Sequence, residues 1–142
     1  MGRIVTSVEV ANALDVSRQI RFDALVDTGA SGLVLPSAWK DRLGSLGATR
    51  MVELQTADQR VIEGEVGGPV SIQIKGFDRI FSEVTFVHMH PENGAYEPLV
   101  GYIILEQSRA AVDMVGHRLV TVKHFDLKRV AEIWTGGGAL PL

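Results

Sequence analysis

The residues best placed to do chemistry in this sequence lie in the stretch ALVDTGASGLVLP, from Ala24 to Pro36. Asp27 stands at the end of an apolar run, where a carboxylate is costly unless other polar groups satisfy it. Thr28 and Gly29 follow, and the small side chains in this stretch leave the backbone open to a ligand that approaches closely. The stretch therefore predicts either a structural turn or a reaction centre in which the carboxylate takes part.

Four chemistries can be compared with this stretch. A serine nucleophile elbow needs Gly-x-Ser-x-Gly, but Leu33 stands where the second glycine belongs. An aspartyl-phosphate enzyme needs Mg²⁺, further carboxylates and usually a parallel sheet, which the strand pattern does not indicate. A phosphate-binding loop needs a lysine after its glycines, whereas Leu33 follows Gly32. An aspartic protease loop, in which Asp27 itself is the catalyst, fits the apolar strand and the small residues around it.

Short strand patterns rich in β-branched residues dominate the rest of the chain, and strands do not alternate with helices. Two strands flank a polar turn at residues 57–60, and we interpret Gly67, Gly68 and Pro69 as a break before a further strand. The pattern predicts a mainly β fold of about eight strands, mostly antiparallel, closed into a barrel or packed as a sandwich. Short helices are expected over residues 37–47, 99–108 and 126–134.

The composition is typical of one globular domain. The chain has 142 residues, 46% of them hydrophobic and 22% charged, with a net charge of −3. We expect one domain over residues 1–135 and a flexible glycine-rich tail over residues 136–142. The small, mixed charge argues against nucleic acid as a partner, and the absence of cysteine excludes disulfides and cysteine zinc sites. No apolar run is long enough for a secretory signal or a membrane span, which indicates a cytoplasmic location.

The stretch LVDTGAS resembles the active-site loop of retropepsin-like aspartic proteases of the short microbial type. Three later segments resemble elements of that family in the same order: the flap hairpin (Leu54–Val66), two apolar residues and a glycine before a helix (Pro98–Glu106), and a closing hairpin (Ala110–Val120). The resemblance implies a symmetric homodimer that hydrolyses peptide bonds with a water activated by two Asp27 carboxylates, one from each subunit. It also implies a peptide or protein substrate and no metal or organic cofactor.

The resemblance also implies a role for each residue that matches a family motif. Related microbial flaps often carry Ala-Asp-Gly, so Gln59 is a departure that makes the tip stiffer. The alternative reading is a non-catalytic domain of the same fold that binds a peptide or protein without turnover. The implied residues are Asp27 as the catalytic group, Thr28, Gly29 and Ala30 in the active-site loop, Ala57, Asp58 and Gln59 in the flap, and Leu99, Val100 and Gly101 as loop support.

Other polar residues receive a structural interpretation. Asp113 is not followed by Thr-Gly and sits beside a predicted hairpin turn, so we read it as a structural residue. His88 and His90 are expected on the same face of a strand, but a metal site needs at least one more ligand, for which Glu92 is the nearby candidate. We therefore predict a solvated strand end there and no metal site.

Overall fold

The computed structural model of the chain describes residues 3–123. In this range the chain is mainly β. The predicted helix over residues 126–134 and the predicted tail over residues 136–142 lie outside the described residues. The strands are β1 (Val5–Asn12), β2 (Asp15–Val26), β3 (Leu33–Pro36), β4 (Ala48–Gln55), β5 (Val61–Ile74), β6 (Arg79–Val87), β7 (Leu99–Val100), β8 (Ala110–Asp113) and β9 (Arg118–Thr121), and the helices are the 3-10 helix η1 (Ser37–Leu43) and α1 (Tyr102–Gln107).

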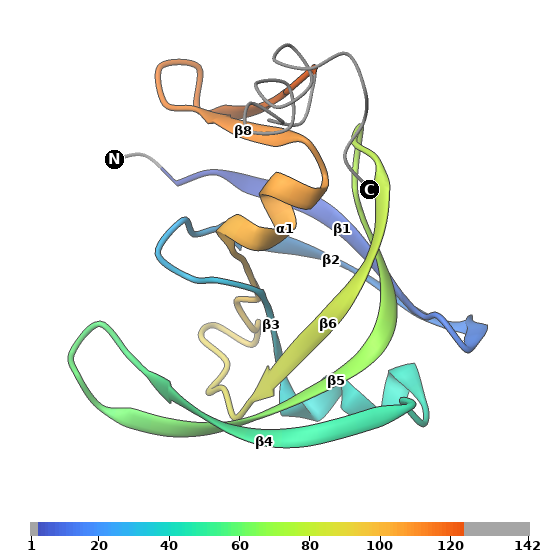
Figure 1. Cartoon of the computed structure of the whole chain (residues 1–142). Helices are drawn as coiled ribbons and strands as arrows, with labels where there is room; N and C mark the ends of the chain where they lie inside the picture. Colours follow the sequence, from blue (N-terminus) through green and yellow to red (C-terminus); the bar gives the residue numbers. More distant parts are fainter. Residues whose placement is uncertain (1–2, 124–142) are drawn as a thin grey trace, which may run out of the picture.

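Seven strands form one sheet in the order β1-β2-β7-β3-β6-β5-β4, while β8 and β9 form a hairpin of their own (Figure 1). β1 also pairs with β5. The prediction of a mostly antiparallel fold is confirmed, although β2 pairs with β7 and β3 pairs with β6 in parallel. These two parallel pairings join strands that are not consecutive in the chain, so the local sequence pattern gave no signal for them.

One predicted strand break is wrong. β5 runs without interruption from Val61 to Ile74, through the segment Gly67–Pro69. Its register with β6 shifts at this segment, so the glycines bend the strand and do not end it. A Cβ atom on Gly68 would lie 3.2 Å from the carbonyl oxygen of Ser82, which explains the absence of a side chain there. The bend lets one strand pair with β4 at one end and with β1 at the other.

The core lies on one face of the large sheet, and it positions the turn between β2 and β3. Ile72 on β5, Val84 on β6 and Leu33 on β3 are fully buried, and Ile104 on α1 packs into the same cluster. Burying each of these side chains stabilises the fold by about 1.5–3 kcal/mol. Within residues 3–123, no helix combines the length and the apolar character that a membrane crossing requires.

Candidate active site

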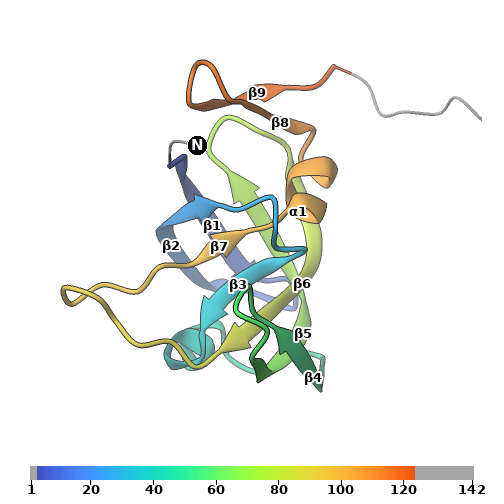
Figure 2. The ribbon, with the colours of Figure 1, turned by 90° about the vertical axis from the view of Figure 1, so that its left-hand side faces the viewer.

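The site is organised around the short strand β7, which lies between β2 and β3 (Figure 2). β7 runs parallel to β2 and antiparallel to β3. The backbone N–H of Asp27 donates to the carbonyl oxygen of Val100 at 2.9 Å, so the residue after β2 is held by the strand beside it. The chain then turns through residues 27–32 and returns as β3. Asp27 is thus delivered by the buried end of β2, where Ala24 and Val26 lie in the core, to an exposed turn.

The carboxylate of Asp27 is held by its own turn. Its Oδ1 atom accepts a hydrogen bond from the backbone N–H of Gly29 at 2.9 Å, and its carbonyl oxygen accepts one from the N–H of Ala30 at 3.1 Å. Asp27 is half-buried, while Thr28 and Gly29 are exposed. The arrangement fixes the direction of the carboxylate and leaves it open to a molecule from outside.

Gly101 and the first turn of α1 brace the other half of the turn. Backbone N–H groups of Gly101, Tyr102 and Ile103 each donate at 2.9 Å, to the carbonyl oxygens of Gly32, Ala30 and Ser31 in that order. A Cβ atom on Gly101 would lie 2.5 Å from the carbonyl carbon of Ser31 and would also overlap the carbonyl oxygen of Ala30. The close approach therefore needs a glycine at position 101, which gives the predicted support residue a specific steric role.

An apolar face leads from Asp27 toward the β4–β5 hairpin. The strand registers place five residues in one lateral row, because directly paired residues project from the same face of a sheet. The row residues are not part of the core cluster, and four of them are half-buried while Val66 is buried. Pattern reasoning on single strands missed this face, since only the register between strands assembles it. Its members are Leu25, Leu99, Val34, Thr85 and Val66.

The turn of the β4–β5 hairpin contains the three residues predicted for a flap. Ala57, Asp58 and Gln59 are exposed and do not pack into the core. Gln59 has φ of 66°, the left-handed region that favours glycine. The turn is closed by a hydrogen bond of 2.8 Å from the N–H of Thr56 to the carbonyl oxygen of Arg60. The tip is therefore a tight turn with backbone strain at Gln59.

The carboxylate of Asp58 clips this turn together. It accepts a hydrogen bond from the Thr56 hydroxyl, and its Oδ2 atom lies 2.8 Å from Nε of Arg60. The Thr56 hydrogen bond, followed by the positive charge of Arg60, lowers the pKa of Asp58 below its ordinary value of 3.8. The clip is thus present when the carboxylate is ionised.

The arms of the β4–β5 hairpin carry one repulsive and one attractive interaction between charged side chains. Glu53 and Glu63 are direct cross-strand partners and repel each other. Nearer the base, Nζ of Lys40 on η1 lies 2.6 Å from Oε1 of Glu65, and this contact lowers the pKa of Glu65. The hairpin is accordingly anchored at its base and strained toward its tip.

The remaining sequence candidates make their described contacts outside the Asp27 turn. Asp113 accepts hydrogen bonds from the backbone N–H groups of Val115 and Gly116 at 3.1 and 2.9 Å, which is the structural role predicted for it. The rings of His88 and His90 meet edge to face with centroids 4.9 Å apart. Within residues 3–123 no group of three or more His, Cys, Asp or Glu side chains is arranged to hold a metal ion.

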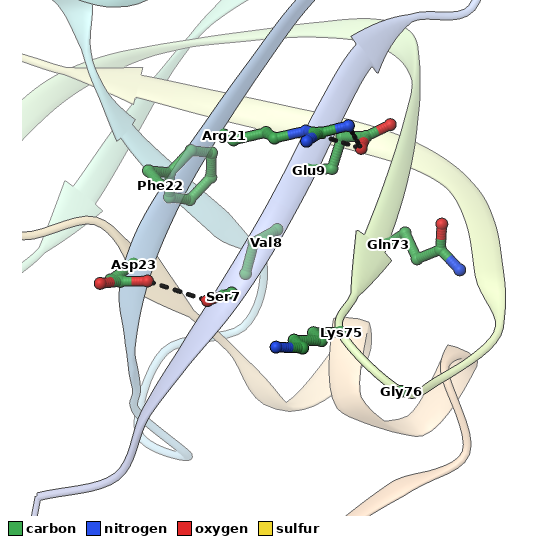
Figure 3. Close-up of a pocket in the computed structure, with 9 residues that line it drawn as sticks. All are labelled: Ser7, Val8, Glu9, Arg21, Phe22, Asp23, Gln73, Lys75 and Gly76. Atoms are coloured by element: carbon green, nitrogen blue, oxygen red, sulfur yellow. Dashed lines mark hydrogen bonds and ion pairs between the residues drawn. The ribbon is translucent and has the colours of Figure 1, made fainter.

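A cavity of about 650 Å³ lies on the outer side of β1, and none of its lining residues belongs to the Asp27 turn (Figure 3). Its polar groups are mostly paired with one another. The Ser7 hydroxyl donates to Asp23 at 3.0 Å, and Arg21 lies 3.0 Å from Glu9. Size alone therefore does not make this cavity the reaction site, because most of the polar groups that line it are already engaged.

Known proteins that are similar to this chain include aspartyl proteases. The family model for aspartyl proteases matches residues 8–100. Among solved structures, the chain is similar to the EIAV protease complexed with the inhibitor HBY-793, with 24% identity over 74% of this chain and 86% of that protein and a TM-score of 0.52. It is also similar to a protein of unknown function from Legionella pneumophila, with 15% identity over 84% of this chain and 93% of that protein and a TM-score of 0.41. A comparison with curated proteins finds no significant match.

Proposed function

Because the chain belongs to the aspartyl protease family and shares the retropepsin-like fold, we propose that it is an aspartic endopeptidase that acts as a symmetric homodimer. Each subunit contributes one Asp27 to a single site on the two-fold axis. The substrate is a peptide or protein, and the reaction needs no metal or organic cofactor. The similar EIAV protein is itself a protease, which supports this assignment.

The chemistry follows from bringing two carboxylates together. Two like charges a few ångströms apart cannot both ionise cheaply, so the pair of Asp27 side chains shares one proton, as in other aspartic proteases. The ionised member takes a proton from water as the water attacks the scissile carbonyl carbon. The protonated member donates to the carbonyl oxygen, and a proton is then passed to the leaving amine as the carbon–nitrogen bond breaks.

The observation that carries this proposal is that the Asp27 turn is braced on one side and open on the other. The turn is braced from behind by β7 and α1, while the carboxylate, Thr28 and Gly29 are open to a partner. Gly29 orients the Asp27 carboxylate, and a small residue lies beside it, so two such turns can meet face to face. In this assembly the Thr28 hydroxyl braces the opposite loop through a hydrogen bond to its backbone.

The substrate is proposed to lie extended across the apolar face that runs from Leu99 through Val34 to Thr85. This face suits apolar side chains, and no charged side chain belongs to its row between Leu25 and Val66. The β4–β5 hairpin acts as a flap over the bound peptide, excludes water and supplies backbone hydrogen bonds.

Cleavage of a mixed peptide library at acid to neutral pH tests the function. We expect cleavage that a statine-type transition-state mimic blocks and that Asp27→Asn abolishes, while folding and dimerisation persist because the amide keeps the shape of the carboxylate. Circular dichroism and size-exclusion chromatography with light scattering verify the folded dimer. A library that binds but survives intact would instead favour the non-catalytic binding domain.

A further inference from the structure

The β4–β5 hairpin has two faces that differ in exposure. Side chains alternate along each arm, so residues two apart in the chain project from the same side of the hairpin. Leu54, Thr56 and Ile62 are half-buried, whereas their neighbours Gln55 and Val61 are exposed. We name the side that carries Leu54, Thr56 and Ile62 the inner face of the hairpin.

The inner face adjoins the apolar face that leads from Asp27. A Cβ atom on Gly64 would lie 3.0 Å from Cδ1 of Leu54 and 3.1 Å from Cγ2 of Thr85, so these two side chains converge over Gly64. Thr85 is itself a member of the apolar face. The tip of the hairpin and the turn between β2 and β3 both project to the left in Figure 1. A peptide that lies extended across the apolar face therefore reaches the inner face of the hairpin.

Arg60 brings a positive charge to the inner face. It lies two residues before Ile62, and its carbonyl oxygen accepts a hydrogen bond of 2.8 Å from the N–H of Thr56 directly across the turn. Nε of Arg60 lies 2.8 Å from Oδ2 of Asp58. Within residues 3–123, no hydrogen bond or ion pair engages the two Nη groups, and the side chain is 76% exposed. The guanidinium is thus held at its Nε edge and open at its Nη edge.

The acidic side chains of the hairpin leave room for a negatively charged ligand at Arg60. Glu53 and Glu63 each lie one residue away from a member of the inner face, so the alternation places them on the other side of the hairpin. At the tip, one carboxylate oxygen of Asp58 accepts from the Thr56 hydroxyl and the other faces Nε of Arg60. Arg60 therefore retains donors that a carboxylate from outside can use.

We propose that Arg60 selects substrates that carry an acidic side chain beside their apolar residues, by donating from its two Nη groups to the carboxylate. The inference rests on the proposed function, because the hairpin must lie over an extended peptide. The planar fork of arginine matches a carboxylate through two parallel hydrogen bonds. The Asp58–Arg60 pair is neutral as a whole, so the preference comes from these directed donors. The substrate class is a peptide with apolar side chains for the apolar face and a glutamate or aspartate at the hairpin tip.

Cleavage of paired peptides tests this selection. The two peptides of a pair share an apolar centre and differ by one glutamate or the isosteric glutamine, which is moved through the positions on either side of that centre. At about pH 6, where glutamate is ionised, the parent chain should prefer the glutamate peptide at one or more positions by about fivefold in kcat/KM. Arg60→Gln should abolish this preference. Asp58→Asn should increase it, because the amide leaves Arg60 without a carboxylate of its own.

These opposite effects distinguish selection from a structural role of the pair. If Asp58 and Arg60 only held the turn together, either substitution would change the cleavage of both peptides alike, and that result would overturn the inference. Circular dichroism of each variant monitors folding.

Arg50→Gln is the matched control on the same hairpin. Arg50 projects from the same side as Leu54, and its substitution removes the same charge, but both of its Nη groups already bind Glu83. The substitution should leave the preference for glutamate unchanged within about twofold, as is usual for a surface change. An equal loss of preference in Arg50→Gln and Arg60→Gln would assign the effect to the net charge of the hairpin and overturn the role of Arg60.

Binding to the Asp27→Asn protein separates this inference from the proposed function. Fluorescence anisotropy of the labelled peptides measures their affinity there without turnover. Tighter binding of the glutamate peptide that Arg60→Gln abolishes, with a parent chain that cleaves nothing, would support the selection and overturn the endopeptidase. A parent chain that cleaves both peptides of every pair equally well would support the endopeptidase and overturn the selection.

Discussion

At the scale of single residues, the site depends on the absence of a side chain at Gly101 as much as on the side chains around Asp27. Gly101 has φ of −91°, which any residue adopts, so its role is steric and not conformational. A side chain there would press on the backbone of Ala30 and Ser31, the two residues that follow Gly29, whose N–H orients the Asp27 carboxylate. Backbone atoms cannot rotate away as a flexible side chain can, so the overlap must displace the turn.

Gly101→Ala should lower the free energy of unfolding by about 1–3 kcal/mol, the usual range for overpacking, and should reduce activity more than stability alone explains. Urea denaturation and peptide cleavage at matched folded fractions measure the two effects. Gly32→Ala is the matched control in the same turn, because a Cβ atom at Gly32 meets nothing within 4 Å. Equal behaviour of the two variants would contradict the steric role of Gly101.

At the scale of elements, the β4–β5 hairpin is built with strain at its tip. Gln59 adopts a left-handed backbone, and the arms bring Glu53 and Glu63 directly opposite each other. Two contacts offset this strain: the Asp58 carboxylate binds Arg60 across the turn, and Lys40 binds Glu65 at the base of the hairpin. This balance suits an element that must open and close, and it makes the tip sensitive to single substitutions.

Gln59→Gly should stabilise the chain by up to about 1 kcal/mol, because glycine adopts the left-handed region without steric cost but loses more chain entropy on folding. Gln59→Val should destabilise it by about 1–3 kcal/mol, since a β-branched residue is strongly disfavoured there. Urea denaturation gives the order of the three proteins. A valine variant as stable as the parent would show that Gln59 does not hold this conformation in solution.

Acidification should loosen the hairpin tip through Asp58. Its pKa in the folded chain is lowered, chiefly by the Thr56 hydroxyl and also by Arg60, below the ordinary value of 3.8. The group therefore contributes stability that is fully present above its unfolded pKa and is lost as pH falls through the lower folded pKa. Hydrogen-exchange protection factors of the tip amides should be constant above about pH 5 and fall below about pH 4. In Asp58→Asn this acid step should vanish, and its persistence would assign the step to another group.

At the scale of the whole molecule, one chain presents half of the proposed site. The Asp27 turn and the tip of the β4–β5 hairpin project to one side, so a two-fold axis along that side places both elements at the proposed interface (Figure 1). Assembly and chemistry are then coupled, because dilution separates the two carboxylates. Removing the repulsion between them should leave the dimer at least as tight.

Mixing the parent chain with Asp27→Asn chains measures this coupling. After exchange of subunits, a heterodimer holds one carboxylate and should have little activity, so total activity should fall with the square of the parent fraction. Peptide cleavage across a series of mixing ratios, at a concentration well above the dissociation constant, gives the curve. A linear fall, or full activity below the dimerisation range, would show that each chain works alone.

The sequence by itself determined the local chemistry. The alternation along the strands predicted a mainly β fold, and the stretch LVDTGAS with three later segments resembled the retropepsin-like family; both are confirmed. The turn at residues 57–60 and the hairpin around Asp113 were predictable for the same reason: strand periodicity and turn chemistry act between residues that are close in the chain. The assignment of Asp27 as the catalytic group stays a prediction.

Only the tertiary structure decided how distant segments meet. The parallel pairing of β2 with β7, the continuous β5 through Gly67 and Gly68, and the overlap that excludes a side chain at Gly101 depend on registers between strands remote in sequence. The apolar face is likewise assembled from single residues of five strands, none of which indicates the face within its own segment. The packing of the whole core selects which distant strands pair, and no local sequence pattern contains those contacts. The surroundings of Asp27 therefore could not be predicted before the fold was known.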